Sequence, residues 1–352
     1  MKSETYEPKS ATLVVGQGLA GTALAWRLRE RGVPFVIADP DQPGTCSKIA
    51  AGLVTPITGK RVKPSWRVEE LLPEAMAFYQ CIEAALNTKF FHPLPLVRLF
   101  KEQREVEWWR GRAGVGGLDQ WVDPGAPLVN EKQFRGELGG FVQRHAGWLD
   151  TAAYLRVSRE LFQSEACVVQ DVVREDDLEE HEDYIRWRGE YFSAVVFCRG
   201  ADERHATRFF PWLRFECARG VIATLRADLS EERIVNRGCW ILPRADGTWR
   251  AGSTYEFDLN TTMETSVADL RGKLLQLVRG PFELTDAQAG IRPIIQHRQL
   301  VIGRHPAHPR VGVFNGLGSK GVLRAPFFAR MLAEHLLDDK PLEAVVDVRG
   351  ND

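Results

Sequence analysis

Residues 11–39, with the sequence ATLVVGQGLAGTALAWRLRERGVPFVIAD, constrain the fold of this chain more than any other segment. The short, β-branched run at residues 12–15 predicts a buried parallel strand, and the apolar run at residues 33–38 predicts a second one. Between them, apolar residues at helical spacing followed by Gly32 predict a helix. This order of strand, glycine turn, helix, strand and acid is typical of a βαβ unit that binds a dinucleotide.

The turn after the first strand has the spacing G-x-G-x-x-G and consists of Gly16, Gln17, Gly18, Leu19, Ala20 and Gly21. The first glycine permits a tight turn, the second lets a pyrophosphate approach, and the third lets the helix pack closely. The helix N-terminus would face the phosphates. Asp39 is expected to bind a ribose hydroxyl, although Asp41 is an alternative. The motif does not distinguish NAD from FAD, and it also fits an ordinary βαβ crossover.

The composition gives little indication of a polyanionic partner. A formal net charge of −1 offers no whole-chain case for nucleic acid or anionic membrane. Residues 1–10 are polar and are expected to form a loose tail rather than a signal peptide, and no apolar stretch approaches the length of a membrane span. The six cysteines are scattered without metal-ligand spacing. We therefore expect a cytoplasmic protein with reduced thiols and no metal site.

The segment after Asp39 combines a loop with small residues. Pro40 begins the loop, and residues 47–53 offer hydroxyls and small side chains that let a backbone pass close to a flat or anionic group. A basic cluster follows, formed by Lys60, Arg61, Lys63 and Arg67. Such a cluster is compatible with a solvated loop or with a site for substrate or phosphate. Both interpretations stay open.

The middle of the chain alternates between helical and extended patterns. Helices are predicted at residues 69–86, 102–110, 151–162 and 266–278. Strands are predicted at residues 94–100, 167–173, 184–188 and 194–198, and glycine residues break the pattern at 111–117. Short runs at residues 218–225, 239–242 and 249–252 alternate as in antiparallel sheet. The pattern predicts a mixed fold with both parallel and antiparallel sheets.

The end of the chain repeats the strand, glycine turn and helix. Residues 311–314 predict a strand, and residues 326–337 predict a helix with Pro326 in its first turn. The turn between them consists of Gly316, Leu317, Gly318, Ser319, Lys320 and Gly321. A second unit this far from the first indicates a ligand that is long enough to be bound at both ends. FAD is such a ligand.

Nine segments taken in order resemble one family. They are VVGQGLAGTALAWRL, SKIAAGLVTP, HAGWLDTAAYL, VVFCRGA, CARG, ILPRADGTWRAGSTYE, AGIRP, LVIGRHP and NGLGSKGVLRAP. The chain resembles the FAD-dependent amine oxidases of the D-amino acid oxidase (DAO) superfamily. Within it, the resemblance is to glycine oxidase, sarcosine oxidase and the oxidase half of the bifunctional enzyme that modifies the wobble uridine of tRNA. It covers nearly the whole chain.

The resemblance implies bound FAD, with the first glycine turn on the pyrophosphate and the second beside the isoalloxazine ring. The family usually has Glu where this chain has Asp39, which leaves the ribose bond plausible. No cysteine lies just before the second turn, where sarcosine oxidases attach their flavin, which argues against covalent flavin. Beyond the first turn, the cofactor-binding residues expected from the resemblance are Asp39, Pro40, Ser47, Ala50, Ala51, Gly52, Leu53, Val172 or its neighbours, Arg199, Gly200, Gly290, Arg292, Gly316, Leu317, Gly318, Ser319, Lys320, Gly321 and Val322.

Three residues are expected to serve the reaction. Arg292, in AGIRP, matches the arginine that binds the substrate carboxylate in D-amino acid and glycine oxidases, although a purely structural ion pair is the alternative. Lys320 would place positive potential at the flavin N1–C2=O edge. Tyr255 would cover or hydrogen-bond the substrate, unless it is an ordinary packing residue. No histidine is assigned as a base, because hydride transfer from an uncharged amine needs none.

The sequence therefore predicts a two-domain α/β (α+β) protein. A Rossmann-like FAD-binding domain of residues 1–60, 145–210 and 300–352 is interleaved with an antiparallel-sheet substrate domain of residues 61–144 and 211–299. The expected activity is oxidation of a small amine or amino acid by hydride transfer to flavin N5, with oxygen or another acceptor and without membrane or nucleic-acid partners. The alternatives are a tRNA-modifying oxidase and a flavin-binding protein without turnover.

Overall fold

The computed structural model describes residues 11–59, 61–112, 117–206, 208–297 and 299–350. The predicted tail of residues 1–10, Lys60 of the basic cluster and part of the predicted break at 111–117 lie outside these ranges. The chain forms two compact units. The first comprises Met1–Lys48, Ala152–Cys217 and Arg292–Asp352, and the second comprises Ile49–Thr151 and Ala218–Ile291.

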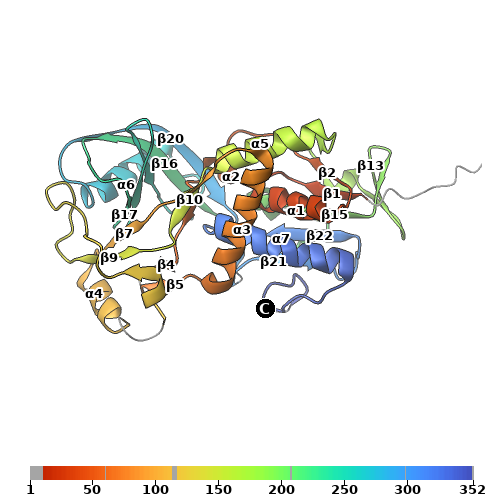
Figure 1. The fold of residues 1–352 in the computed structure, drawn as a ribbon. Coiled ribbons are helices and arrows are strands. Elements are labelled where there is room, and N and C mark those ends of the chain that lie inside the picture. Colours follow the sequence, from red (N-terminus) through yellow and green to blue (C-terminus); the bar gives the residue numbers. More distant parts are fainter. Residues whose placement is uncertain (1–10, 60, 113–116, 207, 298, 351–352) are drawn as a thin grey trace, which may run out of the picture. The chain divides into compact units, whose positions relative to one another are not determined.

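The first unit is built on a six-stranded sheet in the order β11-β2-β1-β15-β22-β21 (Figure 1). Neighbouring strands are parallel from β11 to β22, and β21 is antiparallel to β22. The strands are β1 (Thr12–Val15), β2 (Phe35–Ala38), β11 (Val168–Val169), β15 (Ala194–Phe197), β21 (Val301–Arg304) and β22 (Val311–Asn315). The helices are α1 (Leu19–Glu30), α2 (Cys46–Ile49), α5 (Thr151–Ser164) and α7 (Gly321–Asp338), with short 3-10 turns at Glu175–Asp177 and Gly200–His205.

The register of the central strands separates two faces of this sheet. Leu13 pairs with Val195, and Val15 pairs with Phe197. These four side chains share one apolar cluster with Trp187, which belongs to a small sheet. That sheet consists of β12 (Glu179–Glu180), β13 (Ile185–Trp187) and β14 (Glu190–Phe192). Burying these apolar side chains fixes the register, because a slip by one residue would turn them toward the other face.

Helices α1 and α7 lie side by side in the first unit (Figure 1). Arg31 after α1 forms an ion pair with Asp338 at the end of α7, with Nη2 and Oδ1 2.7 Å apart. On another side of α1, Trp26 contacts the Phe162 ring of α5 and donates a hydrogen bond to Ser158 Oγ at 3.0 Å. Helix α1 is therefore held by α7 on one side and by α5 on another.

The second unit contains an eight-stranded sheet in the order β20-β16-β19-β18-β17-β7-β9-β8. Strand β17 runs parallel to β7, whereas neighbouring strands from β16 to β17 and from β7 to β8 run antiparallel. The strands are β7 (Leu96–Leu99), β8 (Val122–Asp123), β9 (Gly140–Gln143), β16 (Ala218–Ala227), β17 (Ile234–Asn236), β18 (Trp240–Pro243), β19 (Trp249–Gly252) and β20 (Phe282–Arg292). One face packs on α6 (Met263–Leu275) through Leu270 and Leu274.

Smaller elements complete the second unit. Helix α3 (Val68–Leu86) is its longest, and α4 (Gln103–Arg110) is short. The remaining elements are β3 (Leu53–Val54), β4 (Ile57–Thr58), β5 (Lys63–Pro64), β6 (Phe91–Pro93), β10 (Gly147–Leu149) and a 3-10 turn at Asp119–Trp121. Strands β4 and β5 pair as a hairpin, which includes Arg61 and Lys63 of the basic cluster. The expected combination of parallel and antiparallel sheets is confirmed.

Two predicted elements differ from the structure. Helix α7 begins at Gly321 rather than at residue 326, so that Pro326 lies inside the helix. A proline ring fixes φ near the helical value, and the lost N–H is tolerated because buried apolar side chains hold α7 on both sides of Pro326. The strand expected at residues 167–173 is limited to Val168–Val169, since Asp171 and the acidic residues after it have little strand preference.

Among the described residues, no helix combines the length and the apolar character needed to cross a membrane. In the same ranges, no cluster of three or more His, Cys, Asp or Glu side chains is arranged to hold a metal ion.

Candidate cofactor site and substrate-binding arginine

The turn between β1 and α1 leaves no room for side chains at two of its glycines. Gly16 has a φ of +101°, which L-residues rarely adopt, and a Cβ there would lie 2.7 Å from the carbonyl oxygen of Cys198. A Cβ on Gly21 would lie only 1.9 Å from the carbonyl oxygen of Gly16. The two positions therefore require glycine, and their absence of side chains keeps the backbone N–H groups of the turn accessible to a ligand.

The N-terminus of α1 has no cap from its own side chains. Instead, Ser47 reaches it from another segment, and its Oγ accepts a hydrogen bond from Leu19 N at 3.2 Å. The first N–H groups of a helix have no acceptors within the helix, and the helix dipole makes this end positive. Ser47, Gly18 and the first turn of α1 therefore form a cradle with the chemistry of a phosphate site.

Asp39 follows β2 and lies beside this turn. Its Oδ2 accepts a hydrogen bond from Gln17 N at 2.7 Å, and its Oδ1 accepts one from Asp41 N at 2.8 Å. Each carboxylate oxygen has two lone pairs, so Asp39 keeps acceptor capacity for a ribose hydroxyl. Asp41 instead pairs with Lys48, with Oδ1 and Nζ 2.6 Å apart, and this ion pair lowers the pKa of Asp41. Asp39 is thus the better placed of the two candidate acids.

Arg159 of α5 is part of this site, and sequence reasoning did not single it out. It is 8% exposed, and its Nη1 donates to the Gln17 side-chain oxygen and to Asp39 Oδ1, the latter at 3.4 Å. Its Nε lies 3.6 Å from Asp41 Oδ2. A buried charge needs partners. An arginine on the mostly apolar face of this predicted helix was therefore the sequence feature that could have indicated Arg159 as a site residue.

The second glycine turn contacts the first. Gly321 is the first residue of α7, and Leu19 is the first residue of α1. A Cβ on Gly321 would lie 2.9 Å from the Cδ1 atom of Leu19. Asn315 ties the ends of two neighbouring strands together, because its Nδ2 donates to Gly200 O at 2.9 Å. The N-termini of both helices therefore meet at the carboxyl edge of the parallel sheet, where doubly wound folds bind ligands.

Arg292 is held next to the second glycine turn. Gly318 N donates a hydrogen bond to the carbonyl oxygen of Pro293 at 3.0 Å, so the residue after Arg292 is fixed to the turn between β22 and α7. Arg292 itself is half-buried at the end of β20. The two parts of the predicted reactive centre that belong to the first unit, Arg292 and the Gly316 to Lys320 turn, are thus brought together.

Lys320 precedes α7 in the same turn, where burial and the positive charge of Arg324 lower its pKa to about 8. Burial also lowers the pKa of Arg324 to about 10. Arg324 donates to the carbonyl oxygens of Gln299 and Leu317. Two cations therefore lie at the N-terminus of α7, a position that the helix dipole already makes positive. This end of the first unit is suited to an anionic or electron-rich group.

Replacing Lys320 by methionine is expected to stabilise the FAD-free protein most at pH 7. The native lysine has a pKa near 8, while an unfolded lysine titrates near 10.5. Between these values the unfolded chain binds more protons, so wild-type stability rises with pH. The advantage of Lys320→Met should therefore shrink between about pH 8 and pH 10.5. Thermal unfolding at pH 7 and pH 10 measures this; a difference that is the same at both pH values would contradict it.

The other expected residues have varied surroundings. Arg199 is ion-paired with Glu203 and Glu175, with Nε to Oε2 2.9 Å and Nη2 to Oε1 3.1 Å respectively. Its guanidinium is therefore engaged in the protein interior, which leaves only backbone groups of Arg199 for a cofactor. Val172 is 53% exposed after β11. Leu317 and Val322 are buried, whereas Ser319 is exposed.

Several expected residues belong to the second unit. Ala50, Ala51, Gly52 and Leu53 follow α2, and the Ala50 carbonyl oxygen accepts hydrogen bonds from Thr151 Oγ1 and Arg250 Nη1. Tyr255 is 50% exposed and stands edge-on to Phe257, with the ring centroids 5.5 Å apart. Gly290 lies in β20. The cofactor role of the first four, the role of Gly290 and the substrate role of Tyr255 stay predictions, as do the roles assigned to the two domains.

The chain matches the DAO family, described as FAD dependent oxidoreductase, over residues 12–335. The chain belongs to this family. A curated relative is the tRNA 5-methylaminomethyl-2-thiouridine biosynthesis bifunctional protein MnmC of Maricaulis maris strain MCS10, which is 26% identical over 339 residues. The aligned region is 93% of this chain and 52% of that protein, so the chain spans about half the length of this relative.

Solved DAO-family structures share the fold. Iminodiacetate oxidase from Chelativorans sp. BNC1 has a TM-score of 0.73 and 18% identity, covering 95% of this chain and 98% of its own. Glycine oxidase from Geobacillus kaustophilus has a TM-score of 0.73 and 21% identity, covering 94% and 95%. The family resemblance and the fold class expected from the sequence are confirmed.

The residues of the first unit fit FAD, the cofactor of this family. The glycine cradle that a Cβ would fill at Gly21, the phosphate-type donors at α1 and the free acceptor capacity of Asp39 suit the adenosine diphosphate part. The second turn, with Lys320 before α7, contacts the first and suits the flavin end of the same extended molecule. This chain is an FAD-dependent oxidoreductase of the DAO family.

Proposed function

We propose that this oxidoreductase dehydrogenates a small amine or amino acid whose carboxylate is bound by Arg292. The neighbouring structures support this class of substrate, because they are named as a glycine oxidase and an iminodiacetate oxidase. Both named substrates carry a nitrogen one carbon away from a carboxylate. The shared chemical unit is therefore an amine with an α-carboxylate.

A backbone hydrogen bond beside Arg292 is the main support for this proposal. The hydrogen bond from Gly318 N to Pro293 O fixes the chain next to Arg292 against the turn that suits the flavin end of FAD. A guanidinium offers a planar pair of donors that matches both oxygens of a carboxylate. Holding a substrate at two points in this way orients the carbon between the carboxylate and the nitrogen, which is how a bound geometry lowers a barrier.

The chain contributes orientation and electrostatics. When bound, FAD supplies the acceptor for the hydride that leaves the substrate Cα–H. Arg292 neutralises the carboxylate, and Lys320 with the N-terminus of α7 provides positive potential. The amine must be uncharged when the hydride leaves, and its lone pair then forms the C=N bond of an iminium ion, which becomes the imine when it loses a proton. Water adds to this imine and releases the amine and a carbonyl product.

A second candidate is oxidation of a modified nucleoside in tRNA. The match to MnmC extends over 93% of this chain, and Arg61, Lys63 and Arg67 of the basic cluster lie in or beside the β4–β5 hairpin. Binding to tRNA that weakens steeply with salt would favour this candidate. If tRNA is not retained even at low salt, the small-molecule proposal stands alone.

The test is anaerobic mixing of the FAD-loaded protein with single candidate substrates. The panel contains glycine, sarcosine, iminodiacetate, D-alanine, L-proline and spermidine. We expect the flavin absorbance to bleach with at least one α-amino carboxylate and not with spermidine, which lacks a carboxylate. Bleaching by spermidine alone would remove Arg292 from the proposal. A bound flavin that no compound or modified tRNA bleaches would instead support a protein that holds FAD without turnover.

A further inference from the structure

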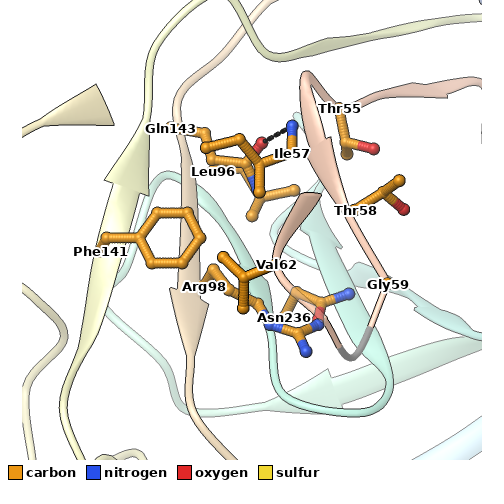
Figure 2. A pocket seen from close by; sticks show the side chains of 10 residues that line it. All are labelled: Thr55, Ile57, Thr58, Gly59, Val62, Leu96, Arg98, Phe141, Gln143 and Asn236. Atoms are coloured by element: carbon orange, nitrogen blue, oxygen red, sulfur yellow. Dashed lines mark hydrogen bonds between the residues drawn. The ribbon is translucent and has the colours of Figure 1, made fainter. Parts of the chain in front are cut away.

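A small cavity lies under the β4–β5 hairpin of the second unit (Figure 2). Its volume is about 50 Å³, whereas about 10–15 Å³ is enough for one water molecule. The hairpin contributes Gly59 and Val62, and the sheet contributes Arg98, Gln143 and Asn236. The cavity therefore has room for a small polar group and walls that include three polar side chains.

The polar residues share one face of the eight-stranded sheet. Arg98 of β7 pairs with Asn236 of β17 and with Phe141 of β9. Leu96, two residues before Arg98, pairs with Gln143. The intervening residue Val97 points to the opposite face, where it joins the apolar cluster under α6. One face of this sheet is thus core, and the other carries the cavity.

Both amide side chains use their oxygen atoms within the protein. Gln143 Oε1 accepts a hydrogen bond from Ile57 N at 2.8 Å, shown in Figure 2, and Asn236 Oδ1 accepts one from Arg98. The partner in each case is an N–H group, which identifies the accepting atom as oxygen. Within the described part of the chain, neither amide nitrogen donates a hydrogen bond. What these two groups still lack is an acceptor.

Arg98 is a charged residue of the cavity lining, and further basic side chains belong to the hairpin and to the segment bound to it. Arg98 Nη2 pairs with Glu105 Oε1 at 2.8 Å, and Glu105 Oε2 accepts from Lys101 N, so this carboxylate is engaged by the protein. Arg112 donates to the carbonyl oxygen of Val62 at 3.0 Å and brings a further guanidinium to the same wall. The exposed Arg61 and Lys63 of the hairpin add to this charge. An anion would be attracted to this wall.

The backbone conformation of Val62 is a further observation that supports a ligand-binding site here. It is 1% exposed and has a φ of +49°, a left-handed conformation that is costly for a β-branched residue. Such strain persists where surrounding contacts impose it, and it gathers at ligand-binding positions. Here Arg112 donates a hydrogen bond to the Val62 carbonyl oxygen, and Val62 lines the same cavity as Arg98.

We propose that this cavity binds a small oxyanion, a carboxylate or phosphate group, through Arg98 and the amide nitrogens of Asn236 and Gln143. A carboxylate presents only acceptors and a phosphate group presents mainly acceptors, which complements donor groups such as the two amide nitrogens. The site belongs to the second unit and does not depend on the proposed function. It assigns a role to the hairpin of the basic cluster, whose Gly59 and Val62 form the cavity roof.

Calorimetric titration of the FAD-loaded protein with sodium acetate and with sodium phosphate, at constant ionic strength, tests the site. We expect saturable binding of at least one anion. Asn236→Asp keeps the acceptor for Arg98 but replaces the amide donor by a negative oxygen, so the Kd should rise by about tenfold or more. Gln143→Glu makes the equivalent change while keeping the bond from Ile57. Asn260→Asp, on an exposed loop of the same unit, is the matched control and should leave the Kd unchanged.

The outcomes separate the possible ligands and the two proposals. Binding of acetate alone identifies a carboxylate site, and binding of phosphate alone identifies a phosphate site. The heat that depends on Asn236 should persist in Arg292→Ala, which distinguishes this cavity from the proposed substrate arginine. The inference is overturned if neither anion gives saturable heat, which would mean a cavity filled by water, or if both folded variants bind as the wild type does.

Discussion

Replacing Gly21 by alanine is expected to abolish retention of FAD during purification. The added Cβ would lie 1.9 Å from the Gly16 carbonyl oxygen and 3.3 Å from Cys198 Cβ, so α1 must move away from β1. The obstacle is backbone rather than a flexible side chain. Overpacking of this kind costs about 1–3 kcal/mol of folding free energy, and it displaces the N–H groups that would face the pyrophosphate. We expect the Kd for FAD to rise by at least about 100-fold, equivalent to about 2.7 kcal/mol.

Two other glycines of the first unit provide a graded comparison. Gly44→Ala places a Cβ where no atom lies within 4 Å and should be neutral. Gly18→Ala meets only Ser47 Oγ at 3.0 Å, a side chain that can rotate, and should have an intermediate effect. Flavin fluorescence titration of the apoproteins measures the Kd, and thermal unfolding of the apoproteins measures stability. An FAD affinity in Gly21→Ala equal to that of Gly44→Ala would remove the first turn from the cofactor site.

The local sequence was sufficient for the first part of this site. Residues 11–39 predicted a strand, a glycine turn, a helix, a second strand and an acid in order, and the structure has β1, α1, β2 and Asp39 at these positions. Each step rests on neighbouring residues, because periodicity and glycine spacing act within a few turns of the chain. The fold favours Asp39 over Asp41 as the ribose-binding acid, because Asp39 accepts from the Gln17 amide of the turn whereas Asp41 is ion-paired with Lys48. That role of Asp39 stays a prediction.

Long-range partners were beyond the sequence. Ser47 meets Leu19 across 28 positions, and Arg159 meets Asp39 across 120. Neither contact follows from a local pattern, since it depends on how α2 and α5 pack on the sheet. The ion pair of Arg199 with Glu175, 24 positions away, likewise engages the Arg199 guanidinium in a contact that no local pattern predicts. The orientations of the Asn236 and Gln143 side-chain amides could not be predicted from the sequence either, because they depend on strand register.

The meeting of the two glycine turns changes how the cofactor site is understood. From the sequence, they were two similar motifs about three hundred positions apart. In the structure, Leu19 and Gly321 are in contact, and Gly318 is bound to Pro293. The first unit therefore joins phosphate-type donors, a ribose-type acid and the neighbour of Arg292 in one continuous arrangement. The position of Arg292 is accordingly coupled to the same turn that would receive the flavin.

The second large effect is expected for Arg292→Ala acting on whichever α-amino carboxylate reduces the flavin. Removing the guanidinium leaves the substrate carboxylate without its paired donors, and truncating one partner of such a pair costs about 2–5 kcal/mol. The KM should therefore rise by about 100-fold or more, equivalent to about 2.7 kcal/mol. The kcat should change by a smaller factor, because neutralising the carboxylate acts on ground state and transition state alike, and only the loss of orientation raises the barrier to hydride transfer. Arg292→Lys keeps the charge but loses the planar fork, so it should recover only part of the KM.

The design isolates the role of this side chain from folding and cofactor binding. Arg156→Ala, on the exposed face of α5 in an ion pair with Glu160 whose side chains are 62% and 58% exposed, is the control and should change neither constant. FAD content and melting temperature should match the wild type in all three variants. Equal KM values for the α-amino carboxylate in Arg292→Ala and wild type would assign Arg292 to structure. The carboxylate would then have to be held by another donor.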